Sequence, residues 1–125
     1  MQFLIHYLIG LVLGFILEFI YRSVESKRFI KPLFINLQMY GFSTAFLYFL
    51  SLFNLPIYFL ILFILIFTTG IEFVIGYIYL KYNNIMLWDY SREYLNYKGL
   101  ICLKFSIAWV ILSLIYYYFI MPIFL

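Results

Sequence analysis

The feature that most constrains this chain is a run of 40 residues, from Pro32 to Ile71, that holds no Asp, Glu, Lys or Arg. A helix needs about 20 mostly apolar residues to cross the ~30 Å hydrocarbon core of a bilayer. Asn54 and Pro56 favour a turn, so the run predicts two spans rather than one. Soluble domains carry about 25% charged residues, whereas this chain carries 10% and is 68% apolar. The sequence therefore predicts an integral membrane protein and excludes a soluble enzyme, a disulfide scaffold and a disordered chain.

Apolar stretches of sufficient length predict an all-α membrane protein with four transmembrane helices. We expect these spans at about residues 2–21, 36–53, 55–80 and 100–121. Two polar loops connect them, at about residues 22–35 and 81–99. No loop is long enough to fold as a soluble domain, so we expect one transmembrane domain over residues 1–125.

All eight basic residues belong to one side of this arrangement. They lie in the two polar loops or just inside the fourth span: Arg22, Lys27, Arg28, Lys31, Lys81, Arg92, Lys98 and Lys104. Loops rich in Lys and Arg stay on the cytoplasmic side of a membrane. We therefore expect a multi-pass protein of the plasma (inner) membrane, with both polar loops inside and both the N and C termini outside.

Each expected span carries one row of small or polar residues, spaced so that they share a helix face. The rows are His6, Gly10, Gly14, Glu18 and Arg22; Asn36, Tyr40, Ser43/Thr44 and Ser51; Thr68/Thr69, Glu72 and Gly76; and Cys102, Ser106 and Ser113. Gly10 and Gly14 form a GxxxG pattern, which allows close helix packing, and Gly76 is a further packing candidate. His6 we place near the membrane surface as an interfacial side chain. The rows either pack the helices tightly or line a polar path.

Two glutamates lie inside expected spans, where an acid is costly and usually faces a partner or a water-filled cavity. Glu18 precedes Arg22 by four residues, the order that favours an ion pair on a helix. Glu72 lies nine residues before Lys81, roughly 13 Å along a helix and hard for that lysine to reach. We expect Glu72 to be protonated, to pair with a basic group from elsewhere, or to be hydrogen-bonded to polar neighbours. The nearest such neighbours are Thr68 and Thr69.

The two halves of the sequence resemble each other. Glu18-Phe19-Ile20 recurs as Glu72-Phe73-Val74, late in the first and third spans, and a basic, aromatic loop follows each. A duplicated two-helix unit would produce this pattern, and so would chance.

The second polar loop contains the most distinctive motif of the chain. Its candidate residues are Trp88, Asp89, Tyr90, Ser91, Arg92, Asn96 and Gly99. Tryptophan and tyrosine suit the headgroup region of a membrane. Asp89 can cap a short helical turn, which Asn96 and Gly99 would end, with Gly99 at positive φ. The loop is therefore either an interfacial anchor or a cytoplasmic gate or docking surface.

This motif resembles a family of small membrane proteins labelled putative ABC-transporter type IV, whose pattern reads W-W-D-Y-S and then F-N-x-x-G-R-I-C-L. The matching residues are Trp88, Asp89, Tyr90, Ser91, Asn96, Gly99, Ile101, Cys102 and Leu103. Thr68, Thr69 and Glu72 resemble the family's T-T-x-x-E, and Tyr40-Gly41-Phe42 its Y-G-F. Leu87 and Leu100 replace its first Trp and its Arg, and its Gly-Pro motif is missing before Tyr40. The resemblance covers most of the chain, as a divergent member, and the label implies transport.

The residues offer little chemistry for catalysis. The chain has no P-loop, no dinucleotide-binding motif and no Cys/His cluster, so we expect no enzyme, no cofactor, no metal and no nucleic-acid partner. Our first hypothesis is a homo-oligomeric transporter or channel subunit in the lipid bilayer. Its copies would join through Gly10 and Gly14, and Glu72, with Glu18, would take part in ion or proton coupling. The alternative is a non-transporting accessory subunit or membrane effector, which docks a partner in a larger membrane complex through its cytoplasmic loops.

Overall fold

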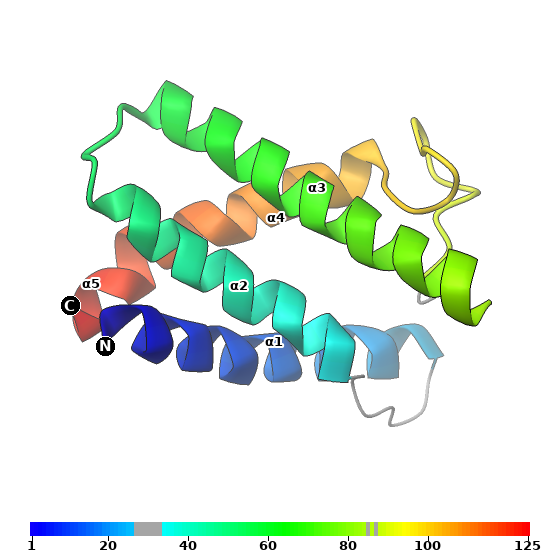
Figure 1. Cartoon of the computed structure of the whole chain (residues 1–125), viewed down its shortest axis with the longest axis horizontal. Coiled ribbons are helices and arrows are strands. Elements are labelled where there is room, and N and C mark those ends of the chain that lie inside the picture. Colours follow the sequence, from blue (N-terminus) through cyan, green and yellow to red (C-terminus); the bar gives the residue numbers. More distant parts are fainter. Residues whose placement is uncertain (27–33, 85, 87) are drawn as a thin grey trace. The chain divides into compact units, whose positions relative to one another are not determined.

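The structure of the chain is a computed structural model that describes residues 1–26, 34–84, 86 and 88–125. Its elements in chain order are α1 (Gln2–Ser26), α2 (Phe34–Ser51), α3 (Ile57–Asn83), α4 (Leu103–Ile115), the π-helix η1 (Tyr116–Ile120) and α5 (Met121–Phe124) (Figure 1). The described residues form no strand. The expected all-α fold is confirmed.

Three helical stretches in the described ranges are long and apolar enough to cross a membrane: Gln2–Val24, Ile57–Asn83 and Leu103–Phe124. Four were expected, so the described helices that meet this criterion are one fewer than expected. The missing span is α2, which has 18 residues. Its polar residues, among them Asn36, Gln38 and Ser43, lower its average apolarity.

Two further boundaries differ from expectation. α1 continues through Ser26, beyond the expected end of the first span, and Lys27, Arg28, Lys31 and Leu87 lie outside the described residues. α4 begins at Leu103 rather than at residue 100. The backbone before it is engaged in the loop, since Tyr97 N–H donates to the Ile101 carbonyl at 2.9 Å and Leu100 N–H to the Tyr97 carbonyl at 3.0 Å.

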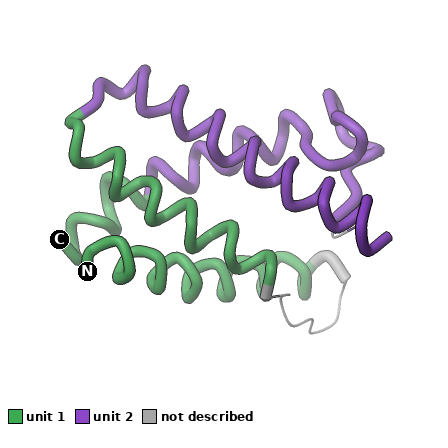
Figure 2. Tube along the Cα trace, in the orientation of Figure 1, with its two compact units in different colours: residues 1–54, 116–125 green, residues 55–115 purple. Residues whose placement is uncertain are grey.

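The chain divides into two compact units (Figure 2). Unit 1 comprises Met1–Asn54 and Tyr116–Leu125, and unit 2 comprises Leu55–Ile115. The first link between them follows Asn54, which has a left-handed φ of 50°. Pro56 then precedes α3 with a φ of −59°, close to the value that its ring imposes and that a helix start requires. The second link is the junction of α4 and η1.

In unit 1, the glycines of α1 allow α2 to approach closely. A methyl group on Gly10 would lie 2.6 Å from the Tyr40 carbonyl oxygen, and one on Gly14 would lie 2.5 Å from Tyr40 Cγ. The Thr44 hydroxyl donates to the His6 carbonyl at 2.7 Å across the same contact. The GxxxG pattern thus packs two helices of one chain. The expectation that this face joins separate copies is wrong, because α2 already covers it.

In unit 2, α3 has one buried row, whose members are spaced by four: Leu60, Ile64, Thr68, Glu72 and Gly76. This spacing keeps the row on one side of the helix. A methyl group on Gly76 would lie 3.1 Å from both Trp88 Cζ2 and Leu100 Cδ2. The loop that follows α3 therefore packs against this helix at Gly76.

Candidate functional site

The candidate site is centred on Glu72, whose side chain lies in the middle of α3 and is only 2% exposed. Its Oε2 atom accepts a hydrogen bond from the Tyr90 hydroxyl at 3.0 Å and one from Trp109 Nε1–H at 3.2 Å. Tyr90 belongs to the loop after α3, and Trp109 to α4. A buried carboxyl group is costly unless donors replace the water it has lost. These two donors, which carry no charge, offset that cost.

The two threonines beside Glu72 are engaged elsewhere. The Thr68 hydroxyl donates to the Ile64 carbonyl at 2.8 Å, within α3. The Thr69 hydroxyl forms a 2.8 Å hydrogen bond with the Ser106 hydroxyl of α4. The described hydrogen bonds of these threonines therefore go to other partners, and Thr69 joins α3 to α4.

Aromatic contacts hold Tyr90 in place. Its ring stacks on Phe105, with centroids 4.7 Å apart and planes 13° apart, and it also stacks on Trp88 at 6.2 Å. Trp88 is fixed in turn, because its Nε1–H donates to the Leu100 carbonyl at 2.7 Å and its ring contacts Gly76. The Trp88-Asp89-Tyr90 part of the motif therefore positions a donor for Glu72.

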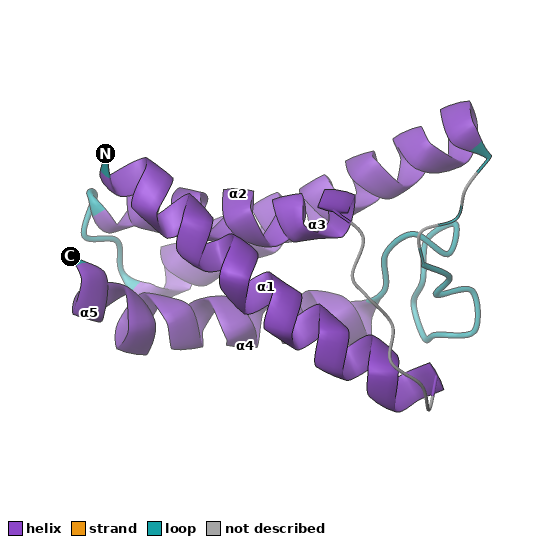
Figure 3. Cartoon of the chain, turned by 90° about the horizontal axis from the view of Figure 1, so that it is seen from below, coloured by secondary structure: helices purple, strands orange, loops and turns teal. Residues whose placement is uncertain are grey.

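The rest of the motif forms a hydrogen-bonded turn rather than helix (Figure 3). Asp89 Oδ1 accepts from Ser91 N–H at 2.9 Å, and Glu93 N–H donates to the Tyr90 carbonyl at 2.8 Å. Tyr90 N–H donates to the Gly99 carbonyl at 2.9 Å, which ties the two ends of the turn together. The capping role expected of Asp89 is thus present, without the expected helical turn.

Asn96 and Gly99 close the turn. The Asn96 side-chain amide donates to the carbonyls of Ser91 at 3.2 Å and Glu93 at 3.0 Å, and its Oδ1 accepts from Gly99 N–H at 3.1 Å. Gly99 has the predicted positive φ, 70°, which a residue without a Cβ adopts at no steric cost. A side chain there would also lie 3.1 Å from Asp89 Oδ1.

The turn favours the ionised form of Asp89. The N–H and the hydroxyl of Ser91 lower the pKa of its carboxyl group, and the positive charge of Arg92 lowers it further. Both effects favour the ionised form. Arg92 itself is exposed and contacts neither Glu72 nor Tyr90 through any described hydrogen bond. We therefore assign it to the outer surface of the turn rather than to the buried site.

Unit 1 contains a second carboxyl group with a tyrosine donor, that of the partly buried Glu18. Its Oε2 accepts from Arg22 Nε at 2.7 Å, as the i,i+4 spacing predicts, with the two side chains 16% and 26% exposed respectively. Its Oε1 accepts from the Tyr40 hydroxyl of α2 at 2.9 Å. Each unit therefore contains a glutamate that accepts a tyrosine hydroxyl, but only Glu18 has a guanidinium partner among its described contacts.

His6 lies in the interior of unit 1 rather than at a surface. Its side chain is 0% exposed, Nδ1 lies 2.6 Å from the Tyr116 hydroxyl, and the ring stacks on Tyr48 at 5.1 Å. The expectation of an interfacial side chain is wrong, because α2 and η1 cover this part of α1.

Four aromatic partners of these polar groups escaped prediction as site residues: Tyr40, Tyr48, Trp109 and Tyr116. Trp109 had a usable signal, because it lies three residues after Ser106 and four before Ser113 and so continues the polar row of that helix. No group of three or more His, Cys, Asp or Glu side chains suited to a metal occurs within the described ranges.

Comparison with known proteins gives one match. The model of a family described as "Putative ABC-transporter type IV" matches residues 5–125, nearly the whole chain and all the residues of both carboxyl sites. No curated protein and no solved structure shows significant similarity.

Proposed function

The chain belongs to the putative ABC-transporter type IV family, and we propose that it is a transport protein of the membrane that uses the Glu72 carboxyl to couple protons or cations. It is a membrane protein by its apolar helices and by its family. The proposed coupling site consists of Glu72 and its two hydrogen-bond donors, Tyr90 and Trp109. Glu18 and Arg22 form a second polar group, an ion pair in unit 1.

The observation that carries this proposal is the surroundings of Glu72. The carboxyl is 2% exposed, and its two described donors, Tyr90 and Trp109, are neutral. Acids inside membrane spans are rare, and they mark ion paths and proton relays. Glu72 is buried, whereas Glu18 is only partly buried. For this reason Glu72 is a better coupling residue than Glu18.

The same proposal includes α2 as a fourth span. With 18 residues it is within the usual range for crossing a bilayer, about 17–25. Its polar side chains are covered, since Asn36 is 0%, Ser43 5% and Thr44 8% exposed. Its low apolarity is therefore compatible with a lipid environment. Four spans and the basic loops together support both termini outside, both polar loops in the cytoplasm, and a location in the plasma membrane.

We further propose that the functional form is a homo-oligomer without enzymatic activity, cofactor or nucleic-acid partner. Four helices of one chain enclose too little space for a wide path, which favours several copies. The contact between copies uses a face other than that of Gly10 and Gly14, since α2 occupies this one.

Purified protein in liposomes tests the coupling role of Glu72. A potassium diffusion potential would drive protons inward, and a pH-sensitive dye in the lumen would report their flux. We expect flux with the wild-type chain and at least about a tenfold loss in Glu72→Gln, which keeps the shape but removes the ionisable group. The control is Glu93→Gln, because Glu93 is a partly exposed loop residue. The same comparison would be repeated with potassium and with sodium as the transported ion. Equal flux through the wild type, Glu72→Gln and Glu93→Gln for every ion would contradict the proposal.

A second candidate function, that of an accessory subunit, has one specific observation in its favour. The hydrogen-bonded turn displays Tyr94, which is 77% exposed, and Leu95, which is 63% exposed with a φ of 52°. Such an ordered apolar tip suits a protein partner. Gentle extraction followed by intact-mass measurement would decide between the two functions. A mass that is a multiple of 15.2 kDa would indicate a homo-oligomer, whereas a stoichiometric complex with another chain would indicate an accessory subunit. Tyr94→Ser should release such a partner, whereas Tyr82→Ser, at a 71% exposed position of α3, should not.

A further inference from the structure

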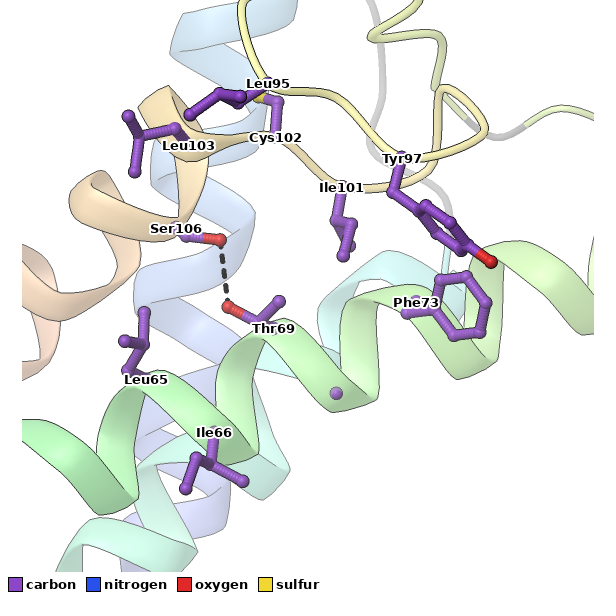
Figure 4. A pocket seen from close by; sticks show the side chains of 11 residues that line it. Leu65, Ile66, Thr69, Phe73, Leu95, Tyr97, Ile101, Cys102, Leu103 and Ser106 are labelled. Atoms are coloured by element: carbon purple, nitrogen blue, oxygen red, sulfur yellow. Dashed lines mark hydrogen bonds between the residues drawn. The ribbon is translucent and has the colours of Figure 1, made fainter.

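Unit 2 has an open groove of about 700 Å³ along one side (Figure 4). Its walls come from α3, from the end of the loop and from the start of α4, and they include Leu65, Ile66, Phe73, Tyr97, Ile101 and Leu103. The hydroxyls of Thr69 and Ser106 also line it, but they bond to each other at 2.8 Å. The lining of the groove is therefore almost entirely apolar, and these two hydroxyl groups already have hydrogen-bond partners.

The floor of the groove is formed by Gly70, which has no side chain to fill it. A methyl group built on this glycine meets no atom within 4 Å. The α3 wall extends from Leu65 to Phe73, a rise of roughly 12 Å along the helix. A narrow apolar trough of this length, on a helix that is apolar enough to cross the membrane, suits one acyl chain.

Two ammonium groups lie beyond one end of the groove, over aromatic rings that contact its lining residue Phe73. There, Phe73 contacts Tyr97 and Tyr77, at centroid distances of 5.7 Å and 5.8 Å. Lys98 Nζ lies 5.5 Å from the Tyr97 centroid and 5.9 Å from that of Tyr77, and Lys81 Nζ lies 5.7 Å from the latter. Both lysines are exposed. Within the described residues, neither has a carboxylate at salt-bridge distance, so both charges are available to an anion.

We propose that this groove binds one anionic phospholipid, with its phosphate at Lys81 and Lys98 and an acyl chain along α3 over Gly70. The combination of an apolar trough, an aromatic edge and paired cations matches the three parts of such a lipid: chain, glycerol region and headgroup. The inference does not depend on transport. It requires only that unit 2 lies in a bilayer.

Native mass spectrometry of the full-length protein in detergent tests the proposal. The probes are phosphatidylglycerol and phosphatidylcholine with identical acyl chains, added separately over a range of concentrations. We expect one phosphatidylglycerol to be retained preferentially. Lys81→Gln and Lys98→Gln should each weaken its binding about fivefold. Lys104→Gln is the control, because Lys104 has the same side chain but lies beside Glu93, 4.0 Å away.

A second pair of variants tests the trough itself. Gly70→Phe should fill the groove and abolish retention of the lipid, since a Cβ at this position meets no atom within 4 Å. Val74→Phe, at a 50% exposed position of the same helix outside the groove, should leave retention unchanged. Equal retention of the two lipids, or unaltered binding in Gly70→Phe, would overturn the proposal. Loss of an oligomer in Gly70→Phe with lipid binding intact would assign the groove to a second copy of the chain and would likewise overturn it.

Discussion

At the scale of single residues, Tyr90 can be altered without disturbing its packing. Tyr90→Phe removes the hydroxyl that donates to Glu72 but keeps the ring that stacks on Phe105. A hydrogen bond to a carboxylate contributes about 1.5–3 kcal/mol, and one to a neutral group about 1 kcal/mol. We therefore expect a loss of about 1–3 kcal/mol in the free energy of unfolding, measured by denaturation in detergent micelles. Tyr94→Phe, at an exposed position, serves as the control and should change nothing.

Asp89 makes the order of the turn dependent on pH. Its pKa is lowered from 3.8 in the folded chain, chiefly by the Ser91 N–H. Its contribution is therefore present above pH 3.8 and is lost as the pH falls through the lower, folded value. Hydrogen exchange at Ser91 and Gly99 should be slow and constant from pH 7 to about pH 5, after correction for intrinsic rates, and protection should fall at more acidic pH.

Asp89→Asn separates charge from geometry in this turn. The asparagine oxygen can still accept from Ser91 N–H, so protection should persist at neutral pH and lose its acid dependence. Asp89→Ala should expose both amides at every pH. Unchanged protection in Asp89→Ala would show that the Asn96 hydrogen bonds alone order the turn.

Residue pairs close in sequence could be predicted, whereas distant ones could not. Glu18 and Arg22 lie one helical turn apart, so their geometry follows from the helix alone. Trp109 reaches Glu72 across 37 positions, and Tyr116 reaches His6 across 110. Such contacts depend on how helices pack, and a sequence with little variation in apolarity carries little information about that.

At the scale of helices, glycines at two positions should respond in opposite ways to alanine. In Gly10→Ala the methyl group would meet the Tyr40 carbonyl at 2.6 Å, which forces α1 and α2 apart and costs about 1–3 kcal/mol. In Gly70→Ala it meets nothing within 4 Å, and alanine is favoured over glycine in a helix by about 1 kcal/mol. Thermal denaturation should therefore show a lower Tm for the first and an equal or higher Tm for the second. A lower Tm for both would indicate that Gly70 is covered.

The helices themselves were largely predictable, and the exceptions have physical causes. Long apolar runs predicted α1, α3 and the α4 region, because a bilayer selects for length and apolarity together. α2 fails the same criterion because its polar residues lower its mean hydropathy. Several of these side chains are buried in the structure, and an average over the sequence of the helix cannot detect that. The π-helix at Tyr116–Ile120 has no recognisable signal in the apolar sequence.

At the scale of the whole molecule, labelling of single cysteines tests the topology. In a Cys102→Ala background, Val24→Cys, Leu52→Cys and Tyr94→Cys place thiols at exposed positions in the last turn of α1, after α2 and in the second polar loop. A membrane-impermeant maleimide should label Leu52→Cys on intact cells, and the other two only after permeabilisation. If α2 does not cross the membrane, Val24→Cys and Leu52→Cys will be labelled from the same side.

The chain passes between its two units twice, at Asn54–Leu55 and at Ile115–Tyr116. One of these links is a left-handed turn residue, and the other is a helix that changes from α to π geometry. Unit 2 is thereby one continuous segment of the chain, whereas unit 1 is completed only by the last ten residues, Tyr116–Leu125.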